Sequence, residues 1–226
     1  VEPQKPYLGT NSLRLNWLSS AGGDWAMTAA TPGWTPYDTS PFDSLIFMAW
    51  TAAEVTAAEL PMIFLEDQSN TRTPRQALSQ FSGSIPADQW TRVSVPLDVF
   101  RLAPGTADLT VINKVFFGQN PAIASGIGHT LIIDEIRIVD ADGAPPAIPQ
   151  TTLRSFERHI EVRWDPSLDP DAETVKIEKR SGATWQHAGD VRAEDGGFAD
   201  WLGAVGLSGV YRAIALDWSL NTSPVG

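Results

Sequence analysis

The sequence predicts an all-β protein made of two β-sandwiches, the second smaller than the first. Seventeen prolines and 18 glycines interrupt the 226-residue chain at short intervals. Between them, short runs alternate apolar and polar side chains, which is the period of a half-buried strand. Helical periodicity is scarce along the whole chain. Many short alternating runs separated by turn residues are typical of sandwich folds.

Seven runs in the first 142 residues are expected to be strands. They are 12–17, 24–30, 45–50, 62–65, 90–97, 111–118 and 130–139. The alternation in the last run breaks at Asp134 and Glu135, which indicates either a bulge or a functional acid. The segment 51–60 contains helix-favouring alanines and glutamates, and we expect either a single helical turn or a loop there.

A proline-rich linker is expected at residues 143–149, where three prolines fall within five residues. Prolines stiffen a chain and cannot donate to a strand ladder, so the linker should be semi-rigid. It divides the chain into a domain of residues 1–142 and a domain of residues 150–226. Strands resume after the linker, and the expected runs are 159–164, 174–179, 185–188 and 210–216.

The composition excludes several classes of partner. Sixteen basic residues face 27 acidic ones, for a net charge of −11. Binding to phosphates requires a basic face, so nucleic acid and anionic membranes are poor partners for this chain. No apolar stretch is long enough to insert in a membrane as a helix. There are no cysteines, which rules out disulfides and thiolate metal sites. A neutral ligand fits this charge balance.

The first half resembles carbohydrate-binding modules with a galactose-binding-like jelly roll. The resemblance extends over most of residues 6–140 and is strongest in the string W-x-x-V-x-V-P-L-x-x-F at 90–100 and in I-I-D-E-I at 132–136. Further matching segments are 9–15, 42–47 and 60–67.

The second half resembles fibronectin type III modules. Residues 160–165 look like the strand that carries the core tryptophan, and residues 211–217 look like the strand that carries the tyrosine corner. Modules of this kind usually act as spacers between a binding module and a catalytic domain.

These resemblances imply a poly- or oligosaccharide-binding, non-catalytic accessory region of a secreted glycan-degrading enzyme. The implied partner is a catalytic domain in the same longer polypeptide, and no organic cofactor is expected. The chain begins without the features of a signal peptide. The expected location is nonetheless secreted, periplasmic or at the cell surface.

Aromatic side chains are the first candidates for sugar contact, because flat rings stack on the C–H faces of sugars. Trp34 and Tyr37 lie in a proline-braced loop, where a core role is unexpected. Trp25 follows two glycines and could be core or surface. Trp50 and Phe64 fall on the outward faces of strands that are also apolar there. Such a face needs a cover, which could be a ligand, the loop 68–80 or the second domain.

Polar side chains must supply the hydrogen bonds that give a sugar site its specificity. Glu66 follows Phe64 on the same expected strand face, and Arg72 and Arg75 flank Pro74 in a turn-rich segment. We therefore expect Glu66, Arg72 and Arg75 to be ligand-binding residues.

A structural calcium ion is implied by the jelly-roll resemblance. In such modules a carboxylate of the last strand meets oxygens from the loop before the first strand. By this resemblance Asp134 would be the carboxylate, and Thr10 and Asn11 would lie in the loop. The alternative is a hydrogen-bonded aspartate at a strand bulge.

Two rival functions remain open. The jelly roll could be a structural spacer or docking module without sugar binding. It could also be a small glycoside hydrolase or lyase with Glu66 and Asp67 on one side of a cleft. No nucleophile elbow, zinc-protease motif or phosphate loop occurs in the sequence. The sequence therefore favours a chain that is not itself an enzyme.

Overall fold

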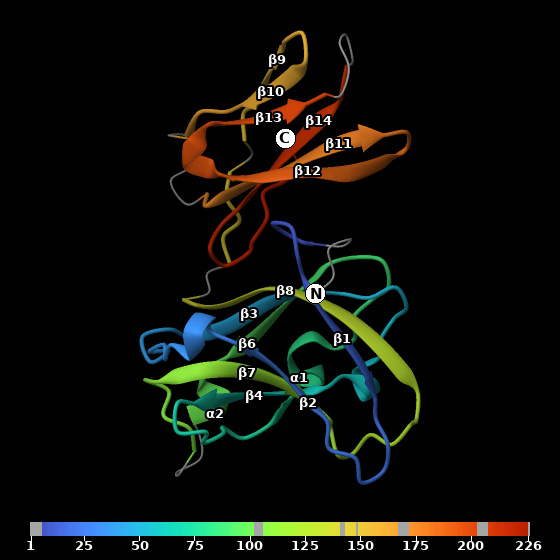
Figure 1. Ribbon diagram of the computed structural model, residues 1–226, viewed down its shortest axis with the longest axis vertical. Coiled ribbons are helices and arrows are strands. Elements are labelled where there is room, and N and C mark those ends of the chain that lie inside the picture. Colours follow the sequence, from blue (N-terminus) through green and yellow to red (C-terminus); the bar gives the residue numbers. More distant parts are fainter. Residues whose placement is uncertain are drawn as a thin grey trace. The chain divides into compact units, whose positions relative to one another are not determined.

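The computed structural model describes residues 6–101, 106–140, 143–147, 149–166, 172–202 and 208–225. The chain divides into two compact units, Val1–Asp140 and Ala141–Gly226 (Figure 1). Of the predicted domain boundary, residues 141, 142 and 148 lie outside the described ranges.

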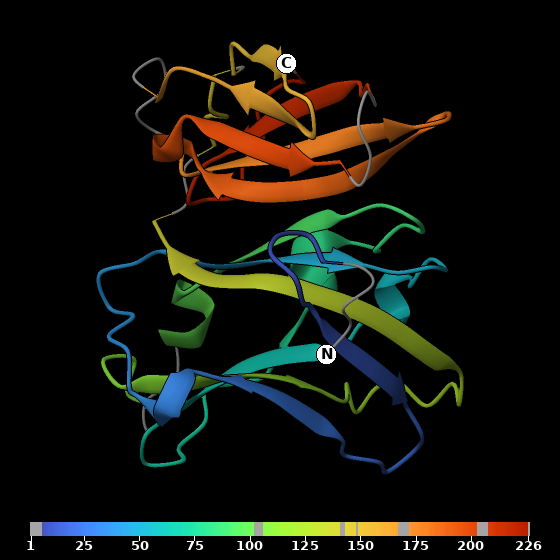
Figure 2. The same ribbon diagram turned by 45° about the horizontal axis from the view of Figure 1, so that its top comes forward.

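The first unit is a sandwich of two four-stranded antiparallel sheets, seen as two layers in Figure 2. One sheet has the order β1-β8-β3-β6 and the other has the order β2-β7-β4-β5. The chain passes repeatedly from one sheet to the other, as in a jelly roll. The strands are β1 (Leu13–Leu18), β2 (Ala26–Ala30), β3 (Ser44–Trp50), β4 (Met62–Asp67), β5 (Gln76–Ala77), β6 (Thr91–Pro96), β7 (Ile112–Gly118) and β8 (Gly128–Val139).

Helices are short in this unit. They are the 3-10 turns η1 (Pro32–Trp34) and η2 (Ala57–Glu59) and the helices α1 (Ser79–Ser82) and α2 (Asp98–Arg101). The segment 51–60 is therefore a loop that contains the single turn η2. Within the described ranges no helix is long and apolar enough to cross a membrane.

The break in the alternation of β8 is a bulge, as one of the two sequence-based interpretations expected. The ladder between β3 and β8 shifts between Ile46 and Met48, opposite Glu135. Glu135 takes a positive φ of 51° to make the extra residue fit. The bulge turns Asp134 toward the segment that precedes β1, as its hydrogen bonds below show.

The core of the first unit lies between the two sheets. Phe47 of β3 and Phe117 of β7 are fully buried and meet edge to face, with ring centroids 5.4 Å apart. Leu45, Ile63 and Leu65 are likewise inaccessible to solvent. Burying each of these side chains stabilises the fold by about 1.5–3 kcal/mol. The two sheets are therefore fixed face to face by apolar packing.

The second unit is also a β-sandwich, with two three-stranded sheets of order β13-β10-β9 and β12-β11-β14. Its strands are β9 (Thr152–Ser155), β10 (His159–Arg163), β11 (Thr174–Ser181), β12 (Thr184–Arg192), β13 (Gly197–Trp201) and β14 (Tyr211–Leu216), and the turn η4 (Ala193–Asp195) precedes β13. Val162, Val175 and Ile177 form its buried centre. Strands β9 and β13 were missed by the sequence analysis.

The all-β fold class is confirmed for the chain. The fibronectin type III likeness of the second unit stays a prediction. One detail differs from the expected tyrosine corner, in which the hydroxyl bonds to the backbone. The Tyr211 hydroxyl instead donates to a carboxylate oxygen of Asp200 at 2.5 Å.

Replacing Phe47 by alanine should destabilise the first unit by about 3–5 kcal/mol, because it leaves a cavity beside Phe117. Urea unfolding followed by circular dichroism measures the change. The matched control is Leu18→Ala, which removes a side chain that is 53% exposed and should change the unfolding free energy by less than about 0.5 kcal/mol. Equal effects of the two substitutions would contradict this account of the core.

Candidate functional site

The outer face of the sheet β2-β7-β4-β5 gathers several of the predicted ligand residues. In the ladder between β4 and β7, Phe64 lies opposite Phe116 and Glu66 lies opposite Lys114. Neighbouring strand residues point to opposite faces. Because Ile63, Leu65 and Phe117 are in the core, these four side chains point away from it. The two phenylalanine rings stack with centroids 4.9 Å apart and planes 6° apart.

The loop after β4 covers these rings with two arginines. The Arg72 guanidinium lies 4.8 Å from the Phe116 ring centroid, and the Arg75 guanidinium lies 4.9 Å from that of Phe64. Both distances are within the range of cation–π attraction. Arg75 also donates to a carboxylate oxygen of Asp24 at 2.8 Å. Of the covers considered for this apolar face, the loop 68–80 is the one that the structure shows.

A charge network is built into the same face. Glu66 is 4% exposed and accepts hydrogen bonds from Lys114 Nζ and, at 2.7 Å, from Arg72 Nε. Lys114 Nζ also donates to Asn70 Oδ1 at 2.9 Å. Burial acts to raise the pKa of Glu66, but the hydrogen bonds from Lys114 and Arg72 outweigh it and hold this pKa below its usual range. Glu66 is therefore a firmly ionised anchor for two cations.

Trp34 lies beside this network with its ring open to water. It is 57% exposed, and Lys114 Nζ is 5.1 Å from the ring centroid. The turn η1 presents it through positive φ angles at Gly33 (65°) and at Trp34 itself (60°). The Thr31 hydroxyl donates to the Thr35 carbonyl at 2.5 Å and closes this turn. Hydrogen bonding within the loop thus positions the exposed ring.

Strand β2 adds an open shelf to this face. Ala26, Thr28 and Ala30 are exposed and lie opposite Gly118, Phe116 and Lys114. Their small side chains leave space beside the arginine-bearing loop, which stands over β4 and β7. We call this surface the Trp34 face, and its members are Trp34, Lys114, Glu66, Arg72, Arg75 and the shelf of Ala26, Thr28 and Ala30.

Three predicted aromatic ligands lie elsewhere. Tyr37 bridges to Ile112, whose side chain is in the core, and its ring stacks on Phe42 at 5.7 Å. Trp25 packs against the core, with its ring centroid 5.9 Å from that of Trp17. Trp50 belongs to the other sheet, where it pairs with Ile132. These three side chains therefore do not join the Trp34 face.

The sequence analysis missed Lys114 of the Trp34 face, its partner Asn70, and Phe116, over which Arg72 lies. The sequence does contain a sign that Lys114 is unusual. In the run 111–118, Asn113 is polar, Lys114 is charged, and every other residue is apolar or glycine. A lysine inside a buried strand requires a partner. The partner, Glu66, lies 48 residues away, so only the strand pairing identifies it.

Asp134 anchors the segment that precedes β1. One carboxylate oxygen accepts from the amides of Tyr7 at 2.7 Å and Leu8 at 3.3 Å, and the other accepts from the Glu135 amide at 2.9 Å. Burial raises the pKa of Asp134, although the amide hydrogen bonds oppose the shift. The observed donors are N–H groups, which suit an anion and do not by themselves form a cation site.

The other two predicted calcium ligands are exposed near this anchor. Asn11 donates through its amide to the Thr10 hydroxyl at 3.1 Å, and Asn11 and Asp134 line the same hollow of about 340 Å³. Among the described residues, no group of three His, Cys, Asp or Glu side chains is placed to hold a metal. The calcium ion stays a prediction.

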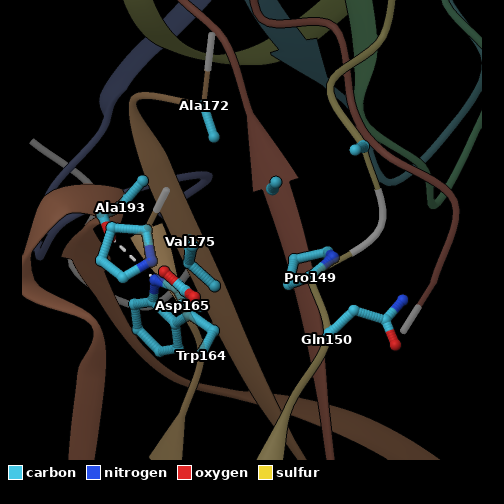
Figure 3. A pocket seen from close by; sticks show the side chains of 10 residues that line it. Pro149, Gln150, Trp164, Asp165, Ala172, Val175 and Ala193 are labelled. Carbon is cyan, nitrogen blue, oxygen red and sulfur yellow. Dashed lines mark hydrogen bonds between the residues drawn. The ribbon is translucent and has the colours of Figure 1, made fainter. Parts of the chain in front are cut away.

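A small pocket in the second unit does not have room for a sugar (Figure 3). It encloses about 30 Å³, which is the space of one or two water molecules. Trp164 forms one wall and donates through its indole nitrogen to the Ala193 carbonyl at 2.8 Å. Val175 and Ala172 contribute apolar surface. This pocket is a packing feature of the sandwich.

The first unit matches a known family. The profile of carbohydrate binding domain 30 matches residues 1–140, which is more than half of the chain. The chain belongs to this family. A crystal structure of a family 30 carbohydrate-binding module superposes with a TM-score of 0.52 at 20% identity, covering 65% of this chain and 77% of that one. The first unit is therefore a sugar-binding module, here called the family 30 unit.

The comparison also corrects one expectation. A curated protein of Parabacteroides distasonis, named as an exo β-1,2-glucooligosaccharide sophorohydrolase, is 27% identical over 94% of this chain. The expectation that the chain is not an enzyme is contradicted by this match, which extends through both units. That expectation rested partly on the lack of short catalytic motifs in the sequence. Such a lack does not exclude a glycoside hydrolase, because its catalytic carboxylates need not lie in a short motif. The chain spans 30% of that relative's length.

The fold of the whole chain is also found in a solved structure. The crystal structure of a β-1,2-glucanase from Parabacteroides distasonis superposes with a TM-score of 0.69 at 24% identity. The superposition covers 99% of this chain and 32% of the glucanase. Both units of this chain therefore have counterparts in one known structure.

Glu66→Gln should lower the unfolding free energy of the family 30 unit by roughly 3 kcal/mol at neutral pH, since it leaves buried Lys114 without its counter-charge. A carboxyl whose pKa is lowered by folding stabilises the fold above its unfolded pKa, and this contribution is lost as pH falls through the folded pKa. The wild type should therefore lose more stability on acidification than Glu66→Gln. Chemical denaturation at a series of pH values measures both curves.

The control for this series is Asp98→Asn, which removes a carboxylate whose side chain is 80% exposed and paired with Arg101. Exposed pairs contribute little, so its curve should follow that of the wild type. Parallel curves for the wild type and Glu66→Gln would contradict the role assigned to the buried pair.

Asp134→Ala should lower the unfolding free energy by about 1–3 kcal/mol, because the amides of Tyr7, Leu8 and Glu135 lose their acceptor. Melting of the wild type with calcium and with a chelator tests the predicted metal. A drop in melting temperature on chelation that is absent in Asp134→Ala would support calcium. Identical melting with and without chelator would contradict it.

Proposed function

We propose that the chain is part of a glycoside hydrolase that acts on β-1,2-linked glucans, and that the Trp34 face holds the glucan chain. The observation that carries the binding site is the open indole of Trp34 beside the network of Glu66, Lys114 and Arg72. The hydrolase match along 94% of the chain supports the choice of glucan. Membership of the carbohydrate-binding family supports a sugar as the ligand.

The Trp34 face has the chemistry that a neutral sugar needs. A flat indole offers apolar surface to the C–H face of a pyranose ring, as aromatic residues do in many recognition sites. Arg72 has an exposed side chain and can donate to hydroxyl groups with the donors that Glu66 does not occupy. Because Glu66 already holds Arg72 and Lys114 in place, little side-chain entropy is lost on binding.

One side of this face reaches an edge of the sheet, which suits a chain ligand. Strand β2 is one of the two outermost strands of its sheet, and its residues Ala26, Thr28 and Ala30 have small side chains. In this proposal the glucan lies along this shelf, between Trp34 and the arginines. Holding the glucan here raises its local concentration near the rest of the enzyme.

We further propose that a catalytic domain belongs to the same longer polypeptide, and that the enzyme works outside the cytoplasm. The first proposal is supported by the greater length of the curated relative, of which this chain spans 30%. The second follows from the substrate, since long glucans do not cross membranes. Release of reducing ends from linear β-1,2-glucan by that polypeptide tests the reaction, and no release would contradict it.

Trp34→Ala should weaken binding of linear β-1,2-glucan by at least about tenfold, which corresponds to about 1.4 kcal/mol. Affinity electrophoresis in gels that contain the glucan measures the effect as lost retardation. The matched control is Tyr37→Ala, because Tyr37 lies in the same loop and is 45% exposed but stacks on Phe42. Retardation that depends on Tyr37 and not on Trp34 would contradict the proposed face.

A further inference from the structure

The second unit presents an exposed sheet face with an unusual set of side chains. In the ladder between β10 and β13, His159 lies opposite Trp201, Glu161 opposite Ala199, and Arg163 opposite Gly197. Ile160 and Val162, which alternate with these residues on β10, are buried in the sandwich. The three cross-strand pairs therefore share the outer face of the sheet β13-β10-β9.

Three aromatic rings form a row across one end of this face. The rings of Phe156 and His159 stack at 4.4 Å with planes 5° apart, and the rings of His159 and Trp201 lie 4.6 Å apart. Trp201 is 72% exposed and Phe156 is 47% exposed. Among the strands that the structure describes, β13 is an outermost strand of its sheet and pairs only with β10. The indole of Trp201 thus contacts the row through His159 and keeps most of its surface open to water.

A polar hollow continues the face away from the rings. It has a volume of about 170 Å³, and it is lined by Glu161, Arg163, Asp195, Gly197, Phe198 and Ala199. Gly197 and Ala199 have small side chains and leave the floor low. Glu161 accepts from Arg163 Nε at 2.8 Å, which orients both charged groups along the hollow. From His159 to Arg163 the strand runs about 13 Å, long enough for a short oligosaccharide.

We propose that this face, Trp201 with the hollow of Glu161, Arg163 and Asp195, is a second saccharide-binding site of the chain. An open indole beside an oriented carboxylate–guanidinium pair repeats the chemistry of the Trp34 face on a different sandwich. The comparison with the carbohydrate-binding family ends at residue 140, so it assigns nothing to this surface. The identity of the sugar rests on the proposed function, and the expected ligand is the same β-1,2-glucan.

Charge and size favour a sugar as the occupant over a macromolecule. The hollow carries both signs of charge, so it offers no basic patch to a nucleic acid. A stable protein interface buries about 800 Å² on each partner around an apolar centre. Here the apolar part is a single row of rings with charged residues directly beside it. A neutral chain with one apolar ring face and many hydroxyl groups matches that pattern.

Two sites on one chain should act together on a long glucan. Occupation of one site makes binding at the other effectively intramolecular, which increases the overall affinity for a polymer. A short oligosaccharide should instead occupy the two sites independently. The ratio of polymer to oligosaccharide affinity therefore reports on the second site.

The test compares the full chain with Trp34→Ala, Trp201→Ala and the double variant, using linear β-1,2-glucan in affinity gels and a short β-1,2-glucooligosaccharide in calorimetry. Each single variant should lower the number of oligosaccharide sites from two to one and reduce polymer retardation at least tenfold. The double variant should show no retardation. Trp218→Ala is the matched control, because Trp218 is an exposed indole of the same unit at 63%, and it should bind like the wild type.

The outcomes separate this inference from the proposed function. If Trp201→Ala binds like the wild type and Trp34→Ala does not bind, the second site is wrong and the Trp34 face stands. If Trp34→Ala binds like the wild type and Trp201→Ala does not bind, the Trp34 face is wrong and the second site stands. Equal losses in Trp201→Ala and Trp218→Ala would also overturn the inference, since they would indicate a general effect on the sandwich. If the wild type does not bind the glucan, both proposals are contradicted.

Discussion

The buried ion pair of Glu66 and Lys114 is the interaction on which the Trp34 face depends. Glu66 and Lys114 sit opposite each other on the central strands of one sheet, where both are less than 10% exposed. Each is tolerable there only because the other neutralises it. Both members of the pair contact a further residue of the face. Arg72 donates a hydrogen bond to Glu66, and the Trp34 ring lies over Lys114. The loop that covers the phenylalanine rings and the ring that faces solvent are thus held by one pair of charges.

The same kind of pairing explains how an acidic protein can gather cations on one face. The chain has a net charge of −11, yet Arg72, Arg75 and Lys114 gather on one face. Each is paired locally, with Glu66 or with Asp24, so the face carries oriented donors without a strong field. Such a surface suits neutral hydroxyl groups and offers little to phosphates. The sugar-binding family to which the chain belongs fits this arrangement.

The two units cover the outer face of a β-sheet in different ways. Each presents the outer face of a β-sheet that would otherwise be a plain solvent surface. In the family 30 unit, the loop after β4 lies over the sheet, and its arginines cover the rings of Phe64 and Phe116. In the second unit the rings of Phe156, His159 and Trp201 brace one another, and small residues lower the floor beside them. In both units an exposed indole lies near a paired carboxylate and guanidinium.

The sequence by itself determined the class of fold, the division into two sandwiches and the exposure of Trp34. Alternation, proline spacing and a proline-braced turn are local properties, because they depend only on residues that are close together in the sequence. Only the tertiary structure decided that Trp34 lies by Lys114 whereas Tyr37, three positions away, stacks on Phe42, and that Lys114 meets Glu66. Those facts depend on the register of strands that are distant in the chain, and a shift of one residue would move every side chain to the opposite face.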